Sequence, residues 1–182
     1  MSEKYKFNNP EGVYFITPTI VHWIDLFTRR GYCDIITDSL DHCQKHKGLV
    51  IYAWCIMPSH LHLIIGTKGL CSLSGIVRDF KKYTSKKIIK EIGNINESRK
   101  EWLLKGFSVA GKNLKRIKDY KVWQDGNHPI ELDTNKMQDD RLSYLHFNPV
   151  EAGFVMHAED YMNSSARDYC GEKGILEIEQ IG

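Results

Sequence analysis

The chain has 182 residues, is 42% hydrophobic and 26% charged, and carries a formal net charge of +2. These values suit one globular domain spanning residues 1–182 rather than a disordered chain, and no apolar run approaches the roughly 18 residues of a membrane span. The N-terminus lacks the apolar core of a signal peptide and the five cysteines form no CxxC pair, so we expect a cytoplasmic protein with free thiols.

Three strands are predicted in the first third of the chain. Residues 12–21 are β-branched and aromatic and follow a Pro-Glu-Gly turn signal, and Pro18 indicates an edge position or an early bend. Residues 49–57 and 60–66 are two further apolar runs, and only Pro58-Ser59 lies between them. That spacing predicts an antiparallel hairpin.

Helices are predicted on both sides of this hairpin. Apolar residues recur loosely at a helical period from residue 34 onward, and Lys47-Gly48 supplies a stop signal. Residues 73–93 carry apolar side chains on one side, with Tyr83 among them as an expected core residue, and Gly93 ends the helix. Shorter helices are predicted near residues 98–107 and 113–120.

The last part of the chain completes the predicted fold. Residues 121–132 are expected to form strand-like pieces about a turn. A helix is expected from about residue 138 to about Phe147, because Pro149 disfavours helical geometry at the residue before it. From about residue 160 we expect an irregular tail. The order of elements fits a ferredoxin-like α+β fold, an antiparallel sheet with helices on one face.

The charge is unevenly distributed along the chain. Residues 78–121 hold 14 of the 25 Lys and Arg but 5 of the 23 Asp and Glu. Such segregation indicates a positive surface for a polyanion such as DNA, although a solvated helix face is the alternative. The candidate DNA-binding residues are Arg78, Lys81, Lys82, Lys86, Lys87, Lys115 and Arg116.

Two histidines one residue apart, His60 and His62, form the first candidate site. Side chains alternate between the faces of a strand, so both imidazoles would lie on one face and could hold one cation. The alternative is a pair of strand histidines whose ring nitrogens are satisfied by backbone or carboxylate partners. A third ligand and a reactive group elsewhere in the chain would favour the metal site.

The stretch LSYLHFNPVEAGFV offers both of these groups. Tyr144 and Asn148 are four residues apart and would share one face of a helix, while His146 would be turned away. An amide oxygen of Asn148 could complete a coordination sphere with the two histidines. The phenol of Tyr144 would then lie close to a cation that favours the phenolate. A tyrosine packed against the sheet is the alternative.

These residues also carry a resemblance to a known family. MPSHLHLII resembles the histidine-hydrophobe-histidine motif of the HUH single-strand endonucleases. YLHFNPVEAGFV resembles the tyrosine helix of the one-tyrosine transposases, in particular the REP-associated tyrosine transposases. The resemblance spans roughly residues 10–170 and implies the HUH endonuclease type of the ferredoxin-like fold.

The resemblance implies a role for each of these residues. His60, His62 and Asn148 would bind a divalent cation, Mg²⁺ or Mn²⁺, although two imidazoles by themselves suit zinc or other transition metals better. Tyr144 would attack a phosphorus of single-stranded, hairpin-associated DNA, leaving a 5′-phosphotyrosine link and a free 3′-hydroxyl. A DNA 3′-hydroxyl can later attack that link and rejoin strands without ATP.

The implied activity is therefore that of a metal-dependent DNA transposase or strand transferase. A domesticated role on repeated hairpins and a non-catalytic hairpin-binding protein of the same fold are the alternatives. Both a monomer and a homodimer are compatible with the sequence.

Two further residues stay open between function and packing. Trp123 could stack on a base or pack in the core. His128 could orient DNA or hydrogen-bond to one of the metal ligands, or it could cap backbone groups in a turn.

Overall fold

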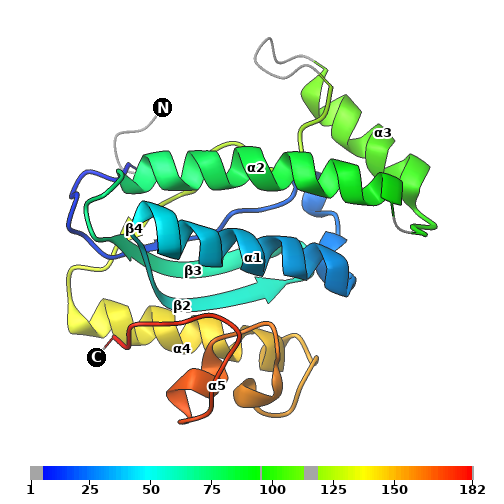
Figure 1. Ribbon diagram of the computed structural model, residues 1–182. Helices are drawn as coiled ribbons and strands as arrows, with labels where there is room; N and C mark the ends of the chain where they lie inside the picture. Colours follow the sequence, from blue (N-terminus) through cyan, green and yellow to red (C-terminus); the bar gives the residue numbers. More distant parts are fainter. Residues whose placement is uncertain (1–5, 95, 113–118, 182) are drawn as a thin grey trace.

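A four-stranded antiparallel sheet forms the centre of the structure (Figure 1), a computed structural model that describes residues 6–94, 96–112 and 119–181. The strand order is β2-β3-β1-β4, which is the order of a ferredoxin-like sheet. The strands are β1 (Tyr14–Ile16), β2 (Leu49–Met57), β3 (His60–Thr67) and β4 (Ile130–Glu131). The predicted fold class is confirmed.

The predicted hairpin forms between β2 and β3. Met57 pairs with His60 across the Pro58-Ser59 turn, and Cys55 pairs with His62. A register shift between Ile51 and Ala53 marks a β-bulge in β2. The bulge changes which face the alternating side chains reach, so β2 contributes apolar groups to both sides of the sheet.

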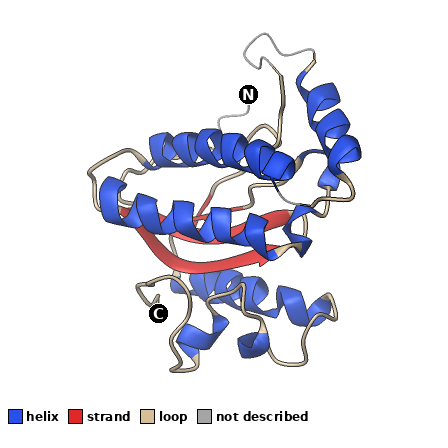
Figure 2. Ribbon diagram, turned by 45° about the vertical axis from the view of Figure 1, so that its right-hand side comes forward, coloured by secondary structure: helices blue, strands red, loops and turns tan. Residues whose placement is uncertain are grey.

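Two long helices cover one face of the sheet (Figures 1 and 2). They are α1 (Arg30–Lys47) and α2 (Leu73–Asn94), which lie side by side and enclose the larger core with the side chains of Ile16, Trp54 and Leu63. Gly48 ends α1 in the left-handed conformation, with φ of 73°, as its place after Lys47 predicts. α1 starts at Arg30, earlier than the sequence pattern indicates.

The opposite face is covered as well, which corrects the expectation of helices on one face. There α4 (Asn135–Glu151) packs Leu145 against Phe15, Ala53 and Met57 in a second, smaller core. The reason is visible in the sequence of β2, LVIYAWCIM, which is a continuous apolar run rather than an alternating one. Such a strand is buried on both faces.

The helix α4 continues past Pro149 to Glu151, so the predicted end at Phe147 is one turn too early. Pro149 lies in the last turn of the helix, so its missing N–H removes one hydrogen bond, to the carbonyl of Leu145, without preventing the turn from forming. After it, Gly153 adopts a φ of 75°, and the amides of Gly153 and Phe154 donate to the carbonyls of Val150 and Pro149. This is a Schellman motif, so the stretch NPVEAGF ends the helix.

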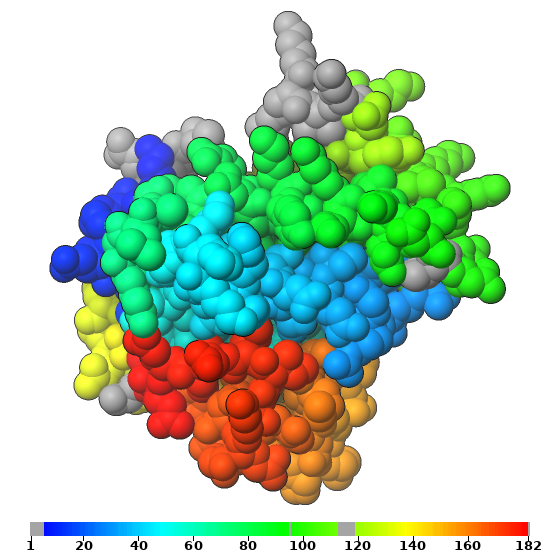
Figure 3. Space-filling view, viewed as in Figure 1, coloured from blue at the N-terminus to red at the C-terminus, as the bar shows by residue number. Residues whose placement is uncertain are grey.

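The chain after α4 lies along the free edge of β2 rather than trailing away. It contains η3 (Ala158–Asp160, a 3-10 helix) and α5 (Ala166–Tyr169). The amide of Ile56 donates to the carbonyl of Asn163, and the amide of Ser165 donates to the carbonyl of Trp54. Figure 3 shows the last residues, in red, packed against the side of the sheet and α1. This segment covers what would otherwise be an open strand edge.

Three shorter helices complete the described chain. They are η1 (Val21–Trp23) and η2 (Leu26–Thr28), two 3-10 helices after β1, and α3 (Lys100–Gly111). β1 is shorter than the predicted strand because the chain bends at Pro18, after which Thr19 and Ile20 form isolated bridges. The helix predicted over residues 113–120 falls largely outside the described residues. Among the helices that the structure describes, none combines the length and the apolarity needed to cross a membrane.

Candidate active site

The two predicted metal ligands meet at the start of β3. The Nε2 atoms of His60 and His62 are 3.1 Å apart, and the two ring centroids are 4.7 Å apart. Each Nδ1 atom is matched by a hydroxyl, that of Ser59 at 3.1 Å from His60 and that of Thr17 at 3.3 Å from His62. The hydroxyls hold both rings so that the two Nε2 atoms converge.

Burial keeps these imidazoles neutral. It lowers the pKa of His60 below its ordinary value, and it lowers the pKa of His62 to about 3, with smaller contributions from His60 and Arg141. A neutral imidazole offers the lone pair that a metal ion needs, whereas an imidazolium repels the ion. The site therefore has the protonation state of a cation-binding pair near neutral pH.

Tyr144 extends from α4 toward the same pair of histidines. Its ring centroid lies 5.2 Å from that of His62, in an edge-to-face arrangement, and 6.2 Å from that of Phe15. The side chain is 43% exposed, so it is a partly open phenol at the rim of the sheet rather than a core tyrosine. Thr134 caps the start of α4 by accepting a hydrogen bond from the amide of Met137, and Leu145 anchors the helix to the sheet.

Asn148 lies one turn after Tyr144 in α4 and is partly buried. The four-residue spacing places both side chains on the same face of the helix. Within the residues that the structure describes, no group of three or more His, Cys, Asp and Glu side chains could hold a metal ion. The amide oxygen of Asn148 stays a prediction as the third ligand beside the histidine pair.

Arg141 is a site residue that sequence reasoning missed. Its guanidinium lies 5.1 Å from the centroid of the Phe15 ring and 6.0 Å from that of Tyr144. It is also close enough to His62 to lower the pKa of that imidazole. A spacing of three residues before Tyr144 places Arg141 on the same helical face, and this spacing was the signal available in the sequence.

His146 is turned away from the site, as the helical spacing predicts. It is buried, and its Nε2 atom lies 2.9 Å from the hydroxyl of Ser165. Burial lowers the pKa of His146 to about 4.

The candidate DNA-binding residues of α2 lie on the other side of the sheet from Tyr144 (Figure 1). Arg78, Lys82, Lys86 and Lys87 are exposed there, and Arg78 forms an ion pair with Asp79 at 3.0 Å. Lys115 and Arg116 lie outside the described residues.

Lys81 has a different environment from its neighbours on α2. Its ammonium donates to the carbonyls of Gln124 and Gly126 at 2.8 and 3.0 Å and to the side chain of Asn127 at 3.0 Å. Burial lowers the pKa of Lys81 to about 8. The ammonium therefore holds the loop before β4 in place.

The structure shows whether three further residues, Tyr83, Trp123 and His128, are buried or exposed. Tyr83 is 52% exposed, so the expectation that it belongs to the core was wrong; it lines a hollow of about 610 Å³ between α1 and α2. Trp123 is buried and donates from Nε1 to the hydroxyl of Thr84 at 3.0 Å, which is the packed alternative. His128 is exposed in the turn before β4, with a φ of 44°, and its role stays a prediction.

With this geometry established, comparison with known proteins defines the class. A solved structure of a REP-associated tyrosine transposase bound to a REP hairpin superposes with a TM-score of 0.66, covering 100% of this chain and 94% of the other at 20% identity. The two proteins share a fold. The chain belongs to the IS200-like transposase family, which matches residues 25–124. No curated protein matches it.

The family assignment confirms the predicted resemblance. The matched residues include both histidines of β3 and all of α2, but they end before α4. The roles of Tyr144 and Asn148 therefore stay predictions, and Arg141 is a candidate that its place beside Tyr144 adds.

Proposed function

We propose that this protein is a metal-dependent single-strand DNA transposase or strand transferase with Tyr144 as its nucleophile. One observation carries the proposal: the Nε2 atoms of His60 and His62 converge, and the ring of His62 contacts the ring of the partly open Tyr144. Nucleophilic catalysis needs a reactive oxygen next to a group that activates the electrophile. The fold brings these two requirements together from strands and helices far apart in the sequence.

The donor set fits a divalent cation. Two neutral imidazoles from His60 and His62 would hold it, with the amide oxygen of Asn148 as the third ligand and open positions for water and phosphate oxygens. A bound Mg²⁺ or Mn²⁺ would supply Lewis-acid polarisation of the phosphodiester. The choice of these ions over zinc follows the resemblance to the HUH endonucleases, since two imidazoles by themselves suit zinc better.

Tyr144 then acts on the DNA backbone. Its phenolic oxygen forms a bond to phosphorus while the bond from phosphorus to the 3′ oxygen breaks, and the departing strand takes a proton to become a 3′-hydroxyl. The product is a 5′-phosphotyrosine link, whose bond energy is similar to that of the phosphodiester bond that was broken. Attack by a DNA 3′-hydroxyl reverses the step, rejoins strands and restores the phenol.

Arg141 is positioned to hold the phosphate that Tyr144 attacks. The guanidinium stands over the Tyr144 ring, where it can donate to non-bridging oxygens as charge builds on them.

The substrate in this proposal is hairpin DNA with a single-stranded flank, in the cytoplasm. The related transposase was solved bound to a REP hairpin. The exposed basic residues of α2 offer a phosphate-binding surface for the duplex part, and the site at β3 and α4 takes the single strand.

Covalent trapping on a denaturing gel tests this function. Purified protein is incubated with end-labelled hairpin DNA in Mn²⁺ or Mg²⁺, beside Tyr144→Phe and the matched control Tyr83→Phe, which removes another exposed phenol on the far side of the sheet. We expect a metal-dependent protein–DNA band that Tyr144→Phe abolishes and Tyr83→Phe keeps. Tight hairpin binding with no band for any flanking sequence would instead establish a non-catalytic binder.

A further inference from the structure

An exposed aromatic groove lies beside the candidate active site, between the η1–η2 segment and α3. It has a volume of about 500 Å³. Trp23 forms one wall and Trp102 the other, and their side chains are 62% and 55% exposed. Lys105 and Val109 of α3 continue the second wall. Two large apolar rings exposed in the same hollow are rarely left without a partner.

The groove is continuous with the histidine pair. The ring centroid of Trp23 lies 5.6 Å from that of His60, in an edge-to-face arrangement. The segment that carries Trp23 is fixed to the β2–β3 turn, because the amide of Ile20 donates to the carbonyl of Ser59 and the amide of Phe27 donates to that of Pro58. Trp23 is therefore within reach of a base next to a phosphate held at His60 and His62.

The backbone is strained where it presents Trp23. His22 and Trp23 have φ values of 57° and 55°, although neither is glycine. Such conformations cost about 1–3 kcal/mol each and persist only where the surroundings impose them. Here Val21 and Ile24, on either side, are buried in the core, which turns the two residues between them outward.

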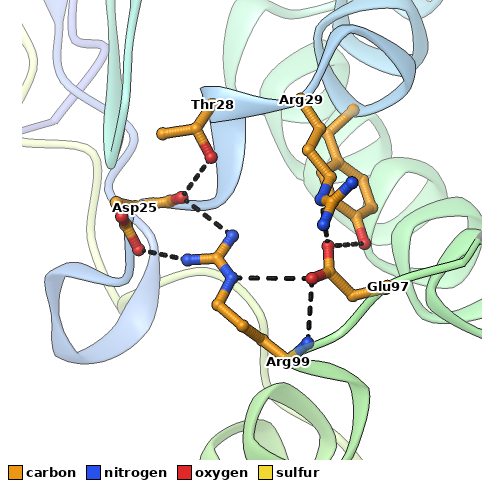
Figure 4. A network of polar contacts seen from close by, with 6 residues as sticks. Asp25, Thr28, Arg29, Glu97 and Arg99 are labelled. Carbon is orange, nitrogen blue, oxygen red and sulfur yellow. Dashed lines mark hydrogen bonds and ion pairs between the residues drawn. The ribbon is translucent and has the colours of Figure 1, made fainter.

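A polar network ties the two walls of the groove together (Figure 4). Arg99, at the start of α3, forms an ion pair of 2.7 Å with Asp25 of the first wall. Glu97, whose side chain is fully buried, binds Arg29 at 2.8 Å and accepts a hydrogen bond from the hydroxyl of Tyr32. The groove is thus a preformed feature with fixed walls.

The charges of the groove suit a ligand that carries both negative phosphates and flat aromatic bases. Asp25, the acidic residue of the lining, is neutralised by Arg99, while Lys105 stays exposed on the outer wall. Aromatic side chains flanked by lysine are how proteins bind single-stranded nucleic acid, the rings stacking on bases and the lysine contacting phosphate.

We propose that this groove binds the nucleobases of the single-stranded DNA next to the phosphate held at His60, His62 and Tyr144. Trp23 and Trp102 stack on bases, and Lys105 contacts the backbone. The inference rests on the proposed function for its substrate and adds a base-binding subsite that positions the strand for cleavage.

Binding is measured without chemistry, so that failure of the subsite and failure of catalysis are distinguishable. The Tyr144→Phe protein is titrated in EDTA with a single-stranded oligonucleotide, with intrinsic tryptophan fluorescence as the readout. Trp54 and Trp123 are buried, so quenching by DNA reports on Trp23 and Trp102. We expect quenching in the parent protein, about tenfold weaker binding in Trp102→Ala, and recovery in Trp102→Phe.

An oligonucleotide series that lacks one base at a time identifies the contact. Removal of the stacked base should weaken binding to the parent protein but not further weaken binding to Trp102→Ala, because both changes delete the same interaction. Unchanged affinity in both Trp23→Ala and Trp102→Ala would overturn the subsite, even if covalent trapping succeeds. A Trp102→Ala change that alters sedimentation but not DNA affinity would also overturn it, since the groove would then be a contact between copies. If the tryptophan variants lose base binding but the protein with Tyr144 forms no covalent adduct, the subsite is supported and the proposed chemistry is contradicted.

Discussion

Arg141 shows how a single residue can change the interpretation of a site. In the proposed function, two histidines and a tyrosine supply metal ligands and the nucleophile, but none of them offsets the charge that builds on a phosphate under attack. The guanidinium over the rings of Phe15 and Tyr144 is held by stacking rather than by an acidic partner in the contacts of the described residues. Donors that no carboxylate occupies can bind a phosphate.

Replacing Arg141 tests this role. We expect Arg141→Ala to slow formation of the covalent adduct by about a hundredfold, because a preorganised donor to the transition state is lost. Arg141→Lys should recover part of the rate, since it keeps the charge but loses the planar fork. Single-turnover rates at saturating DNA measure the effect, with DNA affinity and melting temperature as controls. An unchanged rate in Arg141→Ala would rule out the assigned role.

At the scale of elements, the network around Glu97 decides where α3 lies. The carboxylate is fully buried, and burial alone would raise its pKa. The amide of Arg99 and the guanidinium groups of Arg29 and Arg99 outweigh burial and lower the pKa of Glu97 below its ordinary value. A buried carboxylate with these partners links the start of α1 to the start of α3, and so holds both walls of the aromatic groove.

The pH dependence of stability tests this link. Because the folded-state pKa of Glu97 is lowered, its stabilising contribution is complete above the ordinary carboxyl pKa and is lost as the pH falls through the folded-state value. We expect Glu97→Gln to lower the free energy of unfolding by about 2 kcal/mol at pH 7. The difference in the free energy of unfolding between this variant and the parent protein should become smaller below pH 4. Urea denaturation at both pH values measures it.

Glu101→Gln is the matched control, since Glu101 is an exposed acid in the first turn of α3. It should behave like the parent at both pH values. If the free energies of unfolding of Glu97→Gln and the parent protein differ by the same amount at pH 7 and below pH 4, Glu97 contributes through packing alone.

At the scale of the whole molecule, the proposed function places two kinds of DNA contact on opposite sides of the sheet. Tyr144 belongs to α4 and contacts His62, whereas the exposed lysines belong to α2. These two helices lie on opposite sides of the sheet (Figure 1). A hairpin whose duplex contacts α2 must therefore extend a single strand around the sheet to reach Tyr144. This arrangement predicts that duplex binding and cleavage can be altered independently.

The salt dependence of hairpin affinity distinguishes duplex binding from cleavage. In a Lys82→Gln, Lys86→Gln, Lys87→Gln protein we expect the slope of log affinity against log salt for hairpin DNA to fall by about 0.9 for each DNA phosphate that a lysine no longer neutralises. The rate of adduct formation at saturating DNA should stay unchanged. Lys173→Gln, which removes an exposed lysine of the C-terminal segment, is the control. An unchanged slope in the triple variant would exclude α2 as the duplex surface.

Much of the local structure was predictable because it depends on short-range periodicity. A strand alternates its side chains, so His60 and His62 had to share a face, and a helix brings residues four apart together, so Tyr144 and Asn148 had to share another. The two-residue turn at Pro58-Ser59 predicted the hairpin, and Gly48 predicted the end of α1. These signals lie within a few residues of the features they determine.

The sequence by itself thus determined the antiparallel fold, the histidine pair and the tyrosine helix. The tertiary structure alone decided that α4 crosses to the second face of the sheet, where Tyr144 meets His62, and that Lys81 binds a loop while its neighbours face solvent. It also placed Arg141 beside the phenol and Trp23 beside His60. The reason is physical: periodicity tells which side of its own element a residue occupies, but which elements meet depends on how two apolar sheet faces are buried by segments distant in the chain.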